Sequence, residues 1–477
     1  MAPVLAPLCL CLVSLASAAE PALPPGLTKP QPKNEPSEPA LPAGLGGRSD
    51  EPALPTGLGG KPESPADENE SPLADSHLTL DLSGFAEGRL GTRIQNDPYE
   101  KTASIGEARL QLEADLASPD WTARLVTDVL YDPVVDRHEP HLETGEGALD
   151  LREAWLAFSV FDNADVKVGR QIMTWGTGDL LFINDLFPKD WNAFFIGRDE
   201  EYLKAPNDAV RVSLFTDLAN LDVAYVPNFD ADRFIDGQRI SYYNATLGRR
   251  AGRDAVVQTD RPNRWFRDDE IHYRLYRSIG AVEFAAYGYH GFWKSPGGQT
   301  PGGLAAFPGL NVYGASIRGP LLGGIANGEF GFYDSADDRG GRDPLINNSE
   351  LRYLLGYEHE LATDLTLGVQ YYVEQMLQHD GYLASLPAGV PARDAFRHVL
   401  TARLTWRSMN QNLIWSCFAY YSPSDRDAYL RPSVTYKIDD HWTASVGGNV
   451  FVGAEQHTFF GQFSRDTNVY ASLRYGF

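Results

Sequence analysis

The chain has 477 residues, of which 64 are acidic and 41 are basic, so its formal net charge is −23. This acidic excess disfavours a nucleic-acid partner, because the phosphate backbone requires a positively charged surface. The length would suit two or three ordinary domains. After residue 76, however, no change in composition or residue pattern marks a domain boundary, so one large unit fits better.

Residues 1–19 form an uncharged, apolar segment that ends in Ala16-Ser17-Ala18, the small-residue pattern of a signal-peptide cleavage site. We therefore predict a secretory signal peptide, with a membrane anchor or lipoprotein processing at Cys11 as the alternatives. Removal of this segment would leave Cys417 as the one remaining cysteine. We accordingly expect no internal disulfide bond.

Residues 20–76 contain three related units, EPALPPGL, EPALPAGLGG and EPALPTGLGG, followed by the acidic stretch KPESPADENESP. Repeated proline without a periodic apolar face cannot bury a core and favours an extended chain. We predict a disordered tether in the periplasm. It is interpreted as a spacer, and the alternative is that each unit docks a periplasmic partner.

From residue 77 to residue 477, apolar and polar residues alternate with a period of two, as in EARLQLEADL at 107–116. Periodicity alone fits both a soluble sandwich and a membrane barrel, but the connections distinguish them. Short turns are expected near 118–120, 162–164, 217–220, 278–281, 319–324, 362–364, 409–411 and 438–441. Longer loops are expected to alternate strictly with them. The pattern predicts an all-β fold, a transmembrane antiparallel up-and-down β-barrel of about 18 strands.

Aromatic residues crowd the predicted strand ends, as in the girdles that mark the two interfaces of a membrane barrel. The predicted girdle comprises Trp121, Tyr131, Trp155, Phe161, Trp175, Trp406, Tyr420, Tyr421 and Trp442. The last predicted strand, 468–477, ends in Phe477, which resembles the C-terminal aromatic signature read by the barrel-insertion machinery of the outer membrane. The sequence thus predicts an outer-membrane protein surrounded by lipid, with oligomerisation left open.

The stretch LREAWLAFSVFDNADVKVGRQIMTWGTGD, 151–179, contains Gly169-Arg170-Gln171 and Trp175-Gly176. It resembles outer-membrane barrels of the porin and alginate-export type, in which a Gly-Arg-Gln strand leads into a pore-lining loop. The resemblance implies a channel and places Arg170 in the pore lining. The chain departs from the export proteins in its Pro-rich prefix and in WGTGDLLFINDLFPKDWNAFF, so the resemblance does not carry over a substrate.

If the apolar face of each strand meets lipid, the other face lines a lumen. The predicted pore lining comprises Arg109, Arg124, Lys167, Arg170, Arg211, Arg274, Arg403, Arg431, Arg474, Glu107 and Glu113. The same face also carries Arg89, Arg93, Lys437, Asp81, Glu87, Asp115, Asp128, Glu283 and Glu374. An arginine-rich lining favours anionic solutes. The alternative is that arginines and carboxylates of adjacent strands pair and only support the wall.

The loop at 176–207 is unusually apolar for an external loop, and a segment of this kind should not lie in water. We expect it to fold into the lumen as a constriction, and packing against a neighbouring subunit is the alternative. Its expected polar rim comprises Asp179, Asp185, Lys189, Asp190 and Arg198.

Two acidic loops, 131–147 and 334–343, do not have the spacing of a known calcium loop. We interpret them as solvated acidic loops, with cation binding as the alternative, and expect no metal site and no cofactor. The sequence also has no Gly-x-Ser-x-Gly, His-Glu-x-x-His or phosphate-binding motif, and no enzymatic activity is expected. The sequence therefore predicts a porin for the passive diffusion of small, anionic solutes. The alternatives are an exporter of an anionic polymer, a barrel scaffold for a periplasmic or redox partner, and a barrel-borne enzyme.

Overall fold

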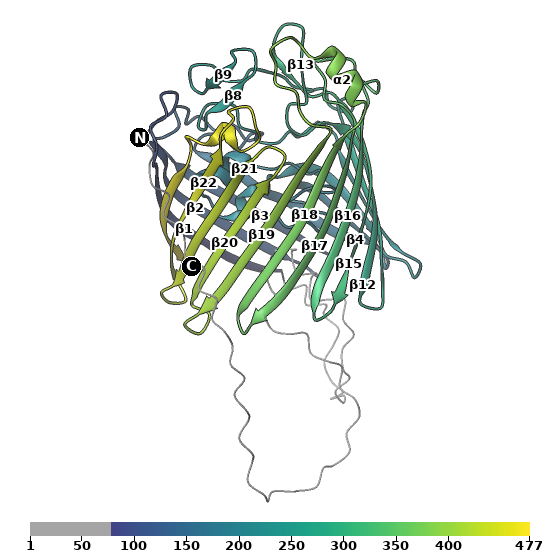
Figure 1. Ribbon diagram of the computed structural model, residues 1–477. Helices are drawn as coiled ribbons and strands as arrows, with labels where there is room; N and C mark the ends of the chain where they lie inside the picture. The colour runs from purple at the N-terminus through teal and green to yellow at the C-terminus, as the bar shows by residue number, and fades with distance from the viewer. Residues whose placement is uncertain (1–77) are drawn as a thin grey trace, which may run out of the picture. The chain divides into compact units, whose positions relative to one another are not determined.

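The computed structural model describes residues 78–477, and these form one antiparallel β-barrel (Figure 1). The predicted signal peptide, 1–19, and the predicted tether, 20–76, lie outside the described residues.

The barrel has 18 strands. The first nine are β1 (Thr79–Arg93), β2 (Ala103–Ala117), β3 (Trp121–Tyr131), β4 (Leu149–Phe161), β5 (Ala164–Gln171), β6 (Asn207–Leu214), β7 (Asn220–Val226), β11 (Glu270–Ile279) and β12 (Val282–Phe292). The others are β15 (Gly309–Leu321), β16 (Gly324–Ser335), β17 (Glu350–Ala362), β18 (Leu365–Met376), β19 (Phe396–Ser408), β20 (Leu413–Ser422), β21 (Asp427–Lys437), β22 (Trp442–Gly453) and β23 (Asn468–Gly476). The predicted fold class and strand number are confirmed.

The first and last strands close the barrel. β1 pairs with β2 on one side and with β23 on the other, in a register that places Phe85 opposite Gly476. Beyond the last strand, the backbone of Phe477 exchanges two hydrogen bonds of 3.0 Å each with the backbone of Gly84. Because every strand has a partner on both sides, the sheet has no open edge.

The strands are joined by short turns at one rim and by longer loops at the other (Figure 1). The short turns are 118–120, 162–163, 215–219, 280–281, 322–323, 363–364, 409–412 and 438–441, close to the predicted positions. The prediction of strict alternation is wrong at one place, because the loop-side connection between β20 and β21 is only 423–426. Here the Ser422 hydroxyl accepts a hydrogen bond from the backbone amide of Asp425 and donates one to the Asp425 carboxylate. These two bonds stabilise a tight turn.

The loops hold the remaining elements. These are the helices α1 (Trp191–Ile196) and α2 (His379–Ser385), the 3-10 turns η1 (Glu200–Leu203) and η2 (Gly461–Phe463), and the short strands β8 (Tyr242–Asn244), β9 (Arg249–Ala251), β10 (Thr259–Asp260), β13 (Gly298–Gln299) and β14 (Ala305–Ala306). Within residues 78–477, no helix combines the length and the apolarity needed to cross a bilayer.

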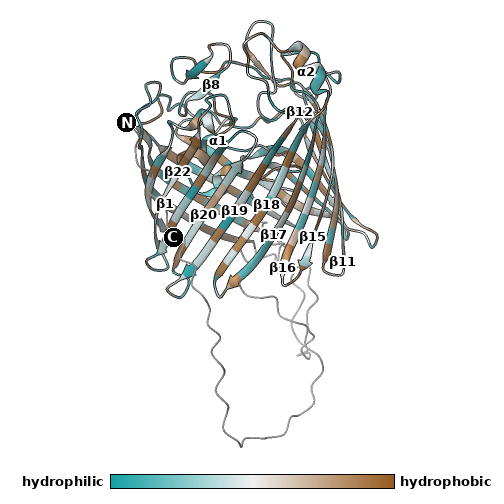
Figure 2. Ribbon diagram, in the orientation of Figure 1, coloured by the Kyte–Doolittle hydropathy of each residue, from teal (hydrophilic) through white to brown (hydrophobic). Residues whose placement is uncertain are grey.

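The alternation of the strands is inverted relative to a water-soluble protein. In β2 the side chains of Leu110 and Leu112 are exposed, whereas Glu107, Arg109 and Gln111 are buried. Hydrophobic and hydrophilic residues alternate in the same way along other strands (Figure 2). An apolar outside and a polar inside are the pattern of a barrel that lies in lipid.

Three members of the predicted aromatic girdle turn inward instead. The ring of Trp155 lies 3.7 Å from the Lys167 ammonium, and Trp175 and Tyr420 belong to buried clusters inside the barrel. Their positions near strand ends suggested a girdle, but the girdle requires the outward face as well. Trp406 and Trp415, in contrast, are exposed and stack side by side at 6.3 Å on the outward face.

Candidate functional site in the barrel lumen

Most of the predicted lining lies on the inward face of the strands, where it alternates with exposed apolar residues. This holds for Glu107, Arg109, Glu113, Arg124, Lys167, Arg211, Arg274, Arg403, Arg431 and Arg474. These positions come from eight strands spread around the wall.

Arg170 is the exception. It shares a face of β5 with Val166 and the exposed Val168, and therefore points away from the lumen. Its guanidinium binds both carboxylate oxygens of Asp208, at 2.8 and 2.6 Å, and the backbone oxygen of Leu142. Arg170 thus ties the loop-side end of β5 to β6 and to a neighbouring loop, and the family resemblance misplaced it.

The inward-facing arginines are mostly paired with carboxylates. Arg124 binds Glu113 and Asp115, each at 2.7 Å, and Arg274 binds Glu283 at 2.8 Å. The other pairs are Arg109 with Glu107 and Asp128, Arg211 with Asp222, Arg403 with Asp179 and Glu200, and Arg474 with Glu87, Asp199 and Glu201. The wall is therefore a nearly neutral network rather than a simple positive surface.

Two basic side chains of the predicted lining differ from the rest. Within the described residues, Lys167 and Arg431 make no ion pair. Lys167 stacks its ammonium on Trp155, and Arg431 donates to the backbone oxygen of Arg198 at 2.6 Å and lies 4.3 Å from the ring of Phe194. Neither group forms a direct ion pair, although Glu153 lies near Lys167 and Asp199 and Glu200 lie near Arg431 and offset part of their charge at longer range.

The loop 172–206, called the inserted loop below, crosses the inside of the barrel. The backbone amides of Thr177 and Gly178 donate to Glu329 of β16, the latter at 2.8 Å. The side chain of Gln370 on β18 both accepts from the amide of Asp179, at 2.7 Å, and donates to its carbonyl, at 2.8 Å. Because Glu329 and Gln370 lie near the middle of their strands, the loop is attached well below the rim.

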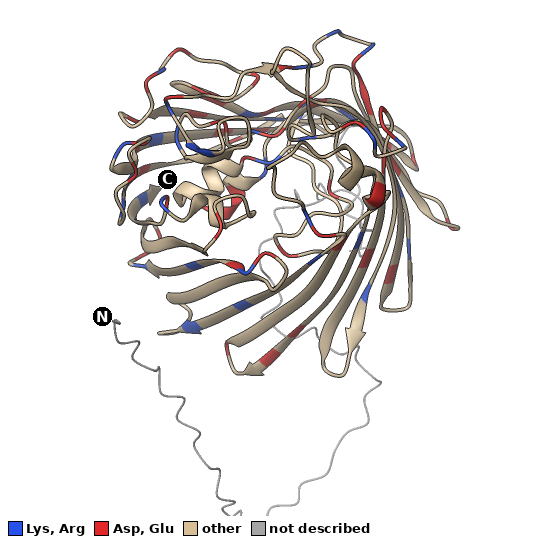
Figure 3. Cartoon of the chain, turned by 45° about the horizontal axis from the view of Figure 1, so that its top comes forward, with Lys and Arg blue, Asp and Glu red and all other residues tan. Residues whose placement is uncertain are grey.

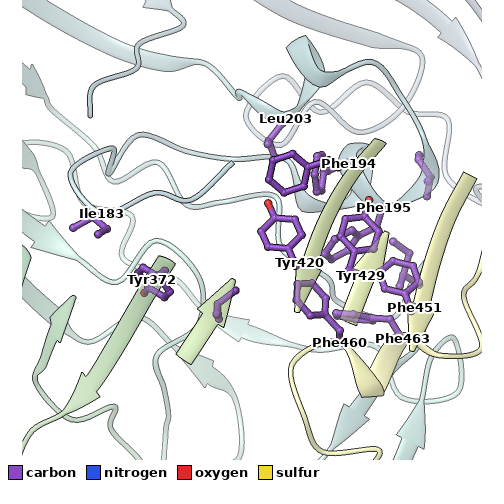
Figure 4. Close-up of a cluster of buried hydrophobic side chains, with 14 of the residues drawn as sticks. Ile183, Phe194, Phe195, Leu203, Tyr372, Tyr420, Tyr429, Phe451, Phe460 and Phe463 are labelled. Carbon is purple, nitrogen blue, oxygen red and sulfur yellow. The ribbon is translucent and has the colours of Figure 1, made fainter. Parts of the chain in front are cut away.

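The apolar residues of the inserted loop find partners on the inward face of the wall. Phe194 and Phe195 of α1 pack against Tyr429 with ring-centroid distances of 5.8 and 5.3 Å, and Phe195 contacts Phe451 at 5.1 Å. Tyr420 donates its hydroxyl to the carbonyl of Leu180 at 2.6 Å. Figure 4 shows this cluster on the strand side of α1. The hydrophobic content of the loop is thereby removed from water inside the barrel.

The predicted polar rim separates into two groups. Asp179 receives two hydrogen bonds from Arg403, at 2.6 and 2.9 Å, and Arg198 binds Glu107 at 2.5 Å, so these two join the loop to the wall. The other three hold the loop itself together. Lys189 pairs with Asp185 at 2.9 Å, and Asp190 caps α1 by accepting from the amide of Ala193 at 2.7 Å.

Sequence reasoning missed the acidic run Asp199, Glu200 and Glu201, which follows α1. Asp199 contacts both Arg89 and Arg474 of the wall, and Glu200 binds Arg403 at 3.0 Å. Burial opposes ionisation of Asp199, but the two arginines outweigh it and lower the pKa of its carboxyl. Burial likewise opposes ionisation of Glu200, but nearby arginines outweigh it and lower that pKa as well, so both carboxyls favour the ionised form that offsets the charge of the wall arginines.

Above the inserted loop, a cavity of about 800 Å³ lies at the loop-side end of the barrel. Its walls come from the inserted loop, from β16 to β20 and from the loops 227–269, 293–308, 336–349, 377–395, 423–426 and 454–467. Figure 3 shows loop segments within the ring of strands, with charged residues on both wall and loops. The volume is in the range of small-molecule sites in proteins.

The acidic loops have protein partners rather than a metal-like arrangement. Asp136 binds Lys101 at 2.7 Å, and Asp334 binds Arg339 at 2.8 Å. In residues 78–477, no group of three or more His, Cys, Asp or Glu is arranged to hold a metal ion.

No protein-family model matches the chain, and a comparison with curated proteins finds no match. Solved structures do resemble it. OccK11 (OpdR) of Pseudomonas aeruginosa is 9% identical with a TM-score of 0.48, and the match covers 83% of this chain and 95% of that one. OccAB2 of Acinetobacter baumannii is 9% identical with a TM-score of 0.48, and the match covers 83% of this chain and 98% of that one. Salmonella typhi OmpF, in a complex with daunomycin, is 10% identical with a TM-score of 0.42, and the match covers 83% of this chain and 97% of that one. At these values no solute or residue role can be transferred.

Proposed function

We propose that the protein is an outer-membrane channel for the passive diffusion of small solutes. The observation that carries this proposal is a closed barrel of 18 strands with an apolar outside and a polar inside. A bilayer core offers the backbone no hydrogen-bond partners, so only helices and closed barrels span it. Barrels of this strand number are wide enough to hold an aqueous path.

The inserted loop supports a size-restricting role. It is bound to the wall from β16 to β23 and to β1 and β2, and it therefore occupies part of the cross-section. Its position inside the barrel leaves less room for a solute than the bare wall would leave. Constriction by this loop is accordingly part of the proposal.

A preference for anions is the finer part of the proposal, and the ion pairs of the wall restrict what supports it. Most lumen arginines are cancelled by a neighbouring carboxylate, so they add little to the local potential. Of the predicted pore-lining residues, Lys167 and Arg431 are the basic ones that form no direct ion pair within the described residues. We expect a modest anion preference that depends on these two side chains.

The test is conductance in planar lipid bilayers. We expect channels whose reversal potential in a salt gradient lies on the anion side, and a shift toward cations when Lys167 and Arg431 are both replaced by Gln. Deletion of Leu180–Phe195 should raise the conductance. Deletion of 380–390, which removes most of α2 but no residue lining the lumen cavity, is the matched control and should leave it unchanged.

The outcomes separate the alternatives. A variant without Leu180–Phe195 that conducts no better than the wild type would contradict the constriction. Absence of conductance in every variant would favour a scaffold for a periplasmic or redox partner, and transport of an anionic polymer but not of small ions would favour an exporter. Contacts with the insertion machinery, a periplasmic partner of the segment 20–76 and a homo-oligomer remain predictions of the sequence.

A further inference from the structure

The cavity at the loop-side end of the barrel has an apolar floor that the fold leaves uncovered. Its lining includes six apolar side chains that are only partly buried: Leu180, Leu181, Phe182, Trp191, Phe234 and Ile235. Their neighbours Phe194, Phe195 and Phe460 are at most 3% exposed, so the same cluster is otherwise well packed. An apolar surface left open inside a concave site is the usual feature of a small-molecule pocket.

The charges around this cavity include several ion pairs, and the lining residues without an ion pair among the described residues are of both signs: Arg393, Arg426, Asp232, Asp394 and Glu455. Arg352 binds Glu350 at 2.7 Å, and Arg397 binds Asp425 at 2.6 Å. Lys189 pairs with Asp185 at 2.9 Å. A charged ligand would have to compete with these pairs for either sign of charge, whereas an uncharged ligand would leave them intact.

One buried hydrogen-bond donor in the lining has no partner among the described residues. Trp293 lines the cavity at 7% exposure, and its indole Nε1–H has no acceptor among the described residues. The other cavity tryptophan, Trp191, donates to Asp232 at 3.2 Å. A buried donor without a partner favours a ligand that brings an acceptor oxygen.

We propose that this cavity is a binding site for uncharged aromatic solutes that carry a hydrogen-bond acceptor. The ring would cover the apolar floor formed by Phe182, Trp191 and Ile235, and the acceptor would satisfy the indole of Trp293. The site deepens the proposed channel function, on which it rests, by naming a solute class that pauses above the inserted loop. The anion preference concerns a different property, the ions that carry current past Lys167 and Arg431.

A sugar is the main competing ligand, because aromatic side chains also stack on sugar rings. Several hydroxyl groups would then have to be satisfied, but many charged groups of the lining already bind one another, as in the pairs Arg352 with Glu350 and Arg397 with Asp425. The floor is apolar, and the buried donor of the lining without a partner among the described residues is the indole of Trp293. The lining therefore favours an aromatic ring over a polyol.

The test is isothermal titration calorimetry on the full chain in lipid nanodiscs, with benzamide as the probe and benzoate and glucose as comparisons. Benzamide is uncharged and carries one carbonyl acceptor. For a ligand of this size we expect a dissociation constant on the order of 1 mM. Benzoate and glucose should bind at least about ten-fold more weakly, since each adds polar groups that the floor cannot satisfy.

Two matched variants localise the binding. Ile235→Asp places a carboxylate on the apolar floor and should weaken benzamide at least about ten-fold. Leu383→Asp places the same group on exposed Leu383 of α2, outside the cavity, and should leave binding unchanged. Gel migration before and after boiling verifies that both variants are folded. Trp293→Phe, which removes the unused donor but keeps an aromatic ring, should weaken benzamide several-fold.

The outcomes are distinct from those of the channel test. Binding of glucose but not benzamide, or equal loss in Ile235→Asp and Leu383→Asp, would overturn the proposed site. A conducting channel that binds none of the three probes would overturn it as well and leave the channel function intact. Benzamide binding without conductance would support the site and contradict the channel.

Discussion

Arg403 holds two carboxylates of the inserted loop at once, Asp179 and Glu200, and it comes from the middle of β19. Its replacement by Gln would leave both carboxylates without a cation. Exposed ion pairs are worth about 0–1 kcal/mol and the rupture of buried ones costs about 3–5 kcal/mol. For this partly buried site we expect about a ten-fold rise in the population with a detached loop, which corresponds to a change of about 1.4 kcal/mol in the free energy of detachment.

Single-channel recording checks this prediction, since detachment should appear as more frequent events of higher conductance. Arg124→Gln is the matched control, because Arg124 binds only wall residues, Glu113, Asp115 and Glu153. It should alter selectivity slightly without adding such events. Identical event frequencies in the two variants would mean that Arg403 does not hold the loop.

Asp466 gives the loop-side rim a dependence on pH. It accepts from Ser241 at 2.8 Å and pairs with Arg93 at 3.0 Å. Burial, with the nearby charge of Asp97, raises the pKa of Asp466 from 3.8 to about 6. A raised pKa means that the folded loops favour the protonated acid, so this stabilisation is complete below about pH 4 and is lost as the pH rises through 6.

Hydrogen exchange of the amides at 461–467 tests this sign. After correction for the intrinsic rate, protection should be about ten-fold higher at pH 5 than at pH 7.5. Asp466→Asn keeps the shape and removes the titration, so its protection should not change over this range. Greater protection of the wild type at pH 7.5 than at pH 5 would show that the ion pair with Arg93 dominates instead.

At the scale of the elements, the features that could be predicted are those whose sequence signals act over short distances along the chain. Strand alternation and turn residues act over a few positions, and they located the strands and the eight short turns. The same parity rule already places Arg170 on the face of Val166 and Val168, a signal that the family resemblance overrode. The apolar content of 176–207 likewise indicated a loop that must avoid water.

The partners of the inserted loop could not be predicted, because they depend on where a folded loop meets eight or more strands. Asp199, Glu200 and Glu201 look in sequence like an ordinary solvated acidic turn. In the structure Asp199 and Glu201 reach Arg474, Glu200 reaches Arg403, and Asp199 also reaches Arg89. Each of these partners is more than a hundred residues away along the chain. Long-range ion pairs of this kind leave no periodic pattern.

The acidic run makes a prediction about selectivity. Replacing Asp199, Glu200 and Glu201 by Asn, Gln and Gln removes three negative charges next to wall arginines and adds none. The local potential should become more positive, so the reversal potential should move further to the anion side. The control for net charge replaces three aspartates of a loop-side segment, Asp337, Asp338 and Asp343, by Asn, which removes the same number of negative charges. An equal shift in both variants would mean that net charge, rather than the charge beside the arginines, sets selectivity.

At the scale of the whole molecule, the barrel depends on the seam between its two ends. The seam is formed by the pairing of β1 with β23 and is extended by the two hydrogen bonds between Phe477 and Gly84. These bonds use backbone atoms, whereas the Phe477 ring is half exposed on the outward side, next to Tyr475 at 6.4 Å. The terminal residue therefore has two separable roles, closing the seam and presenting an aromatic ring.

Two variants of Phe477 separate these roles. Phe477→Ala keeps the backbone pair with Gly84 and removes the ring, whereas deletion of Phe477 removes both. If the ring is read by the insertion machinery, both variants should reach the outer membrane in lower amounts and leave protein in the periplasm. The fraction that does insert should still migrate anomalously on a gel until it is boiled, because a closed ladder has no edge from which to unravel. Normal insertion of Phe477→Ala together with failure of the deletion would show that the seam hydrogen bonds, and not the aromatic ring, are what insertion requires.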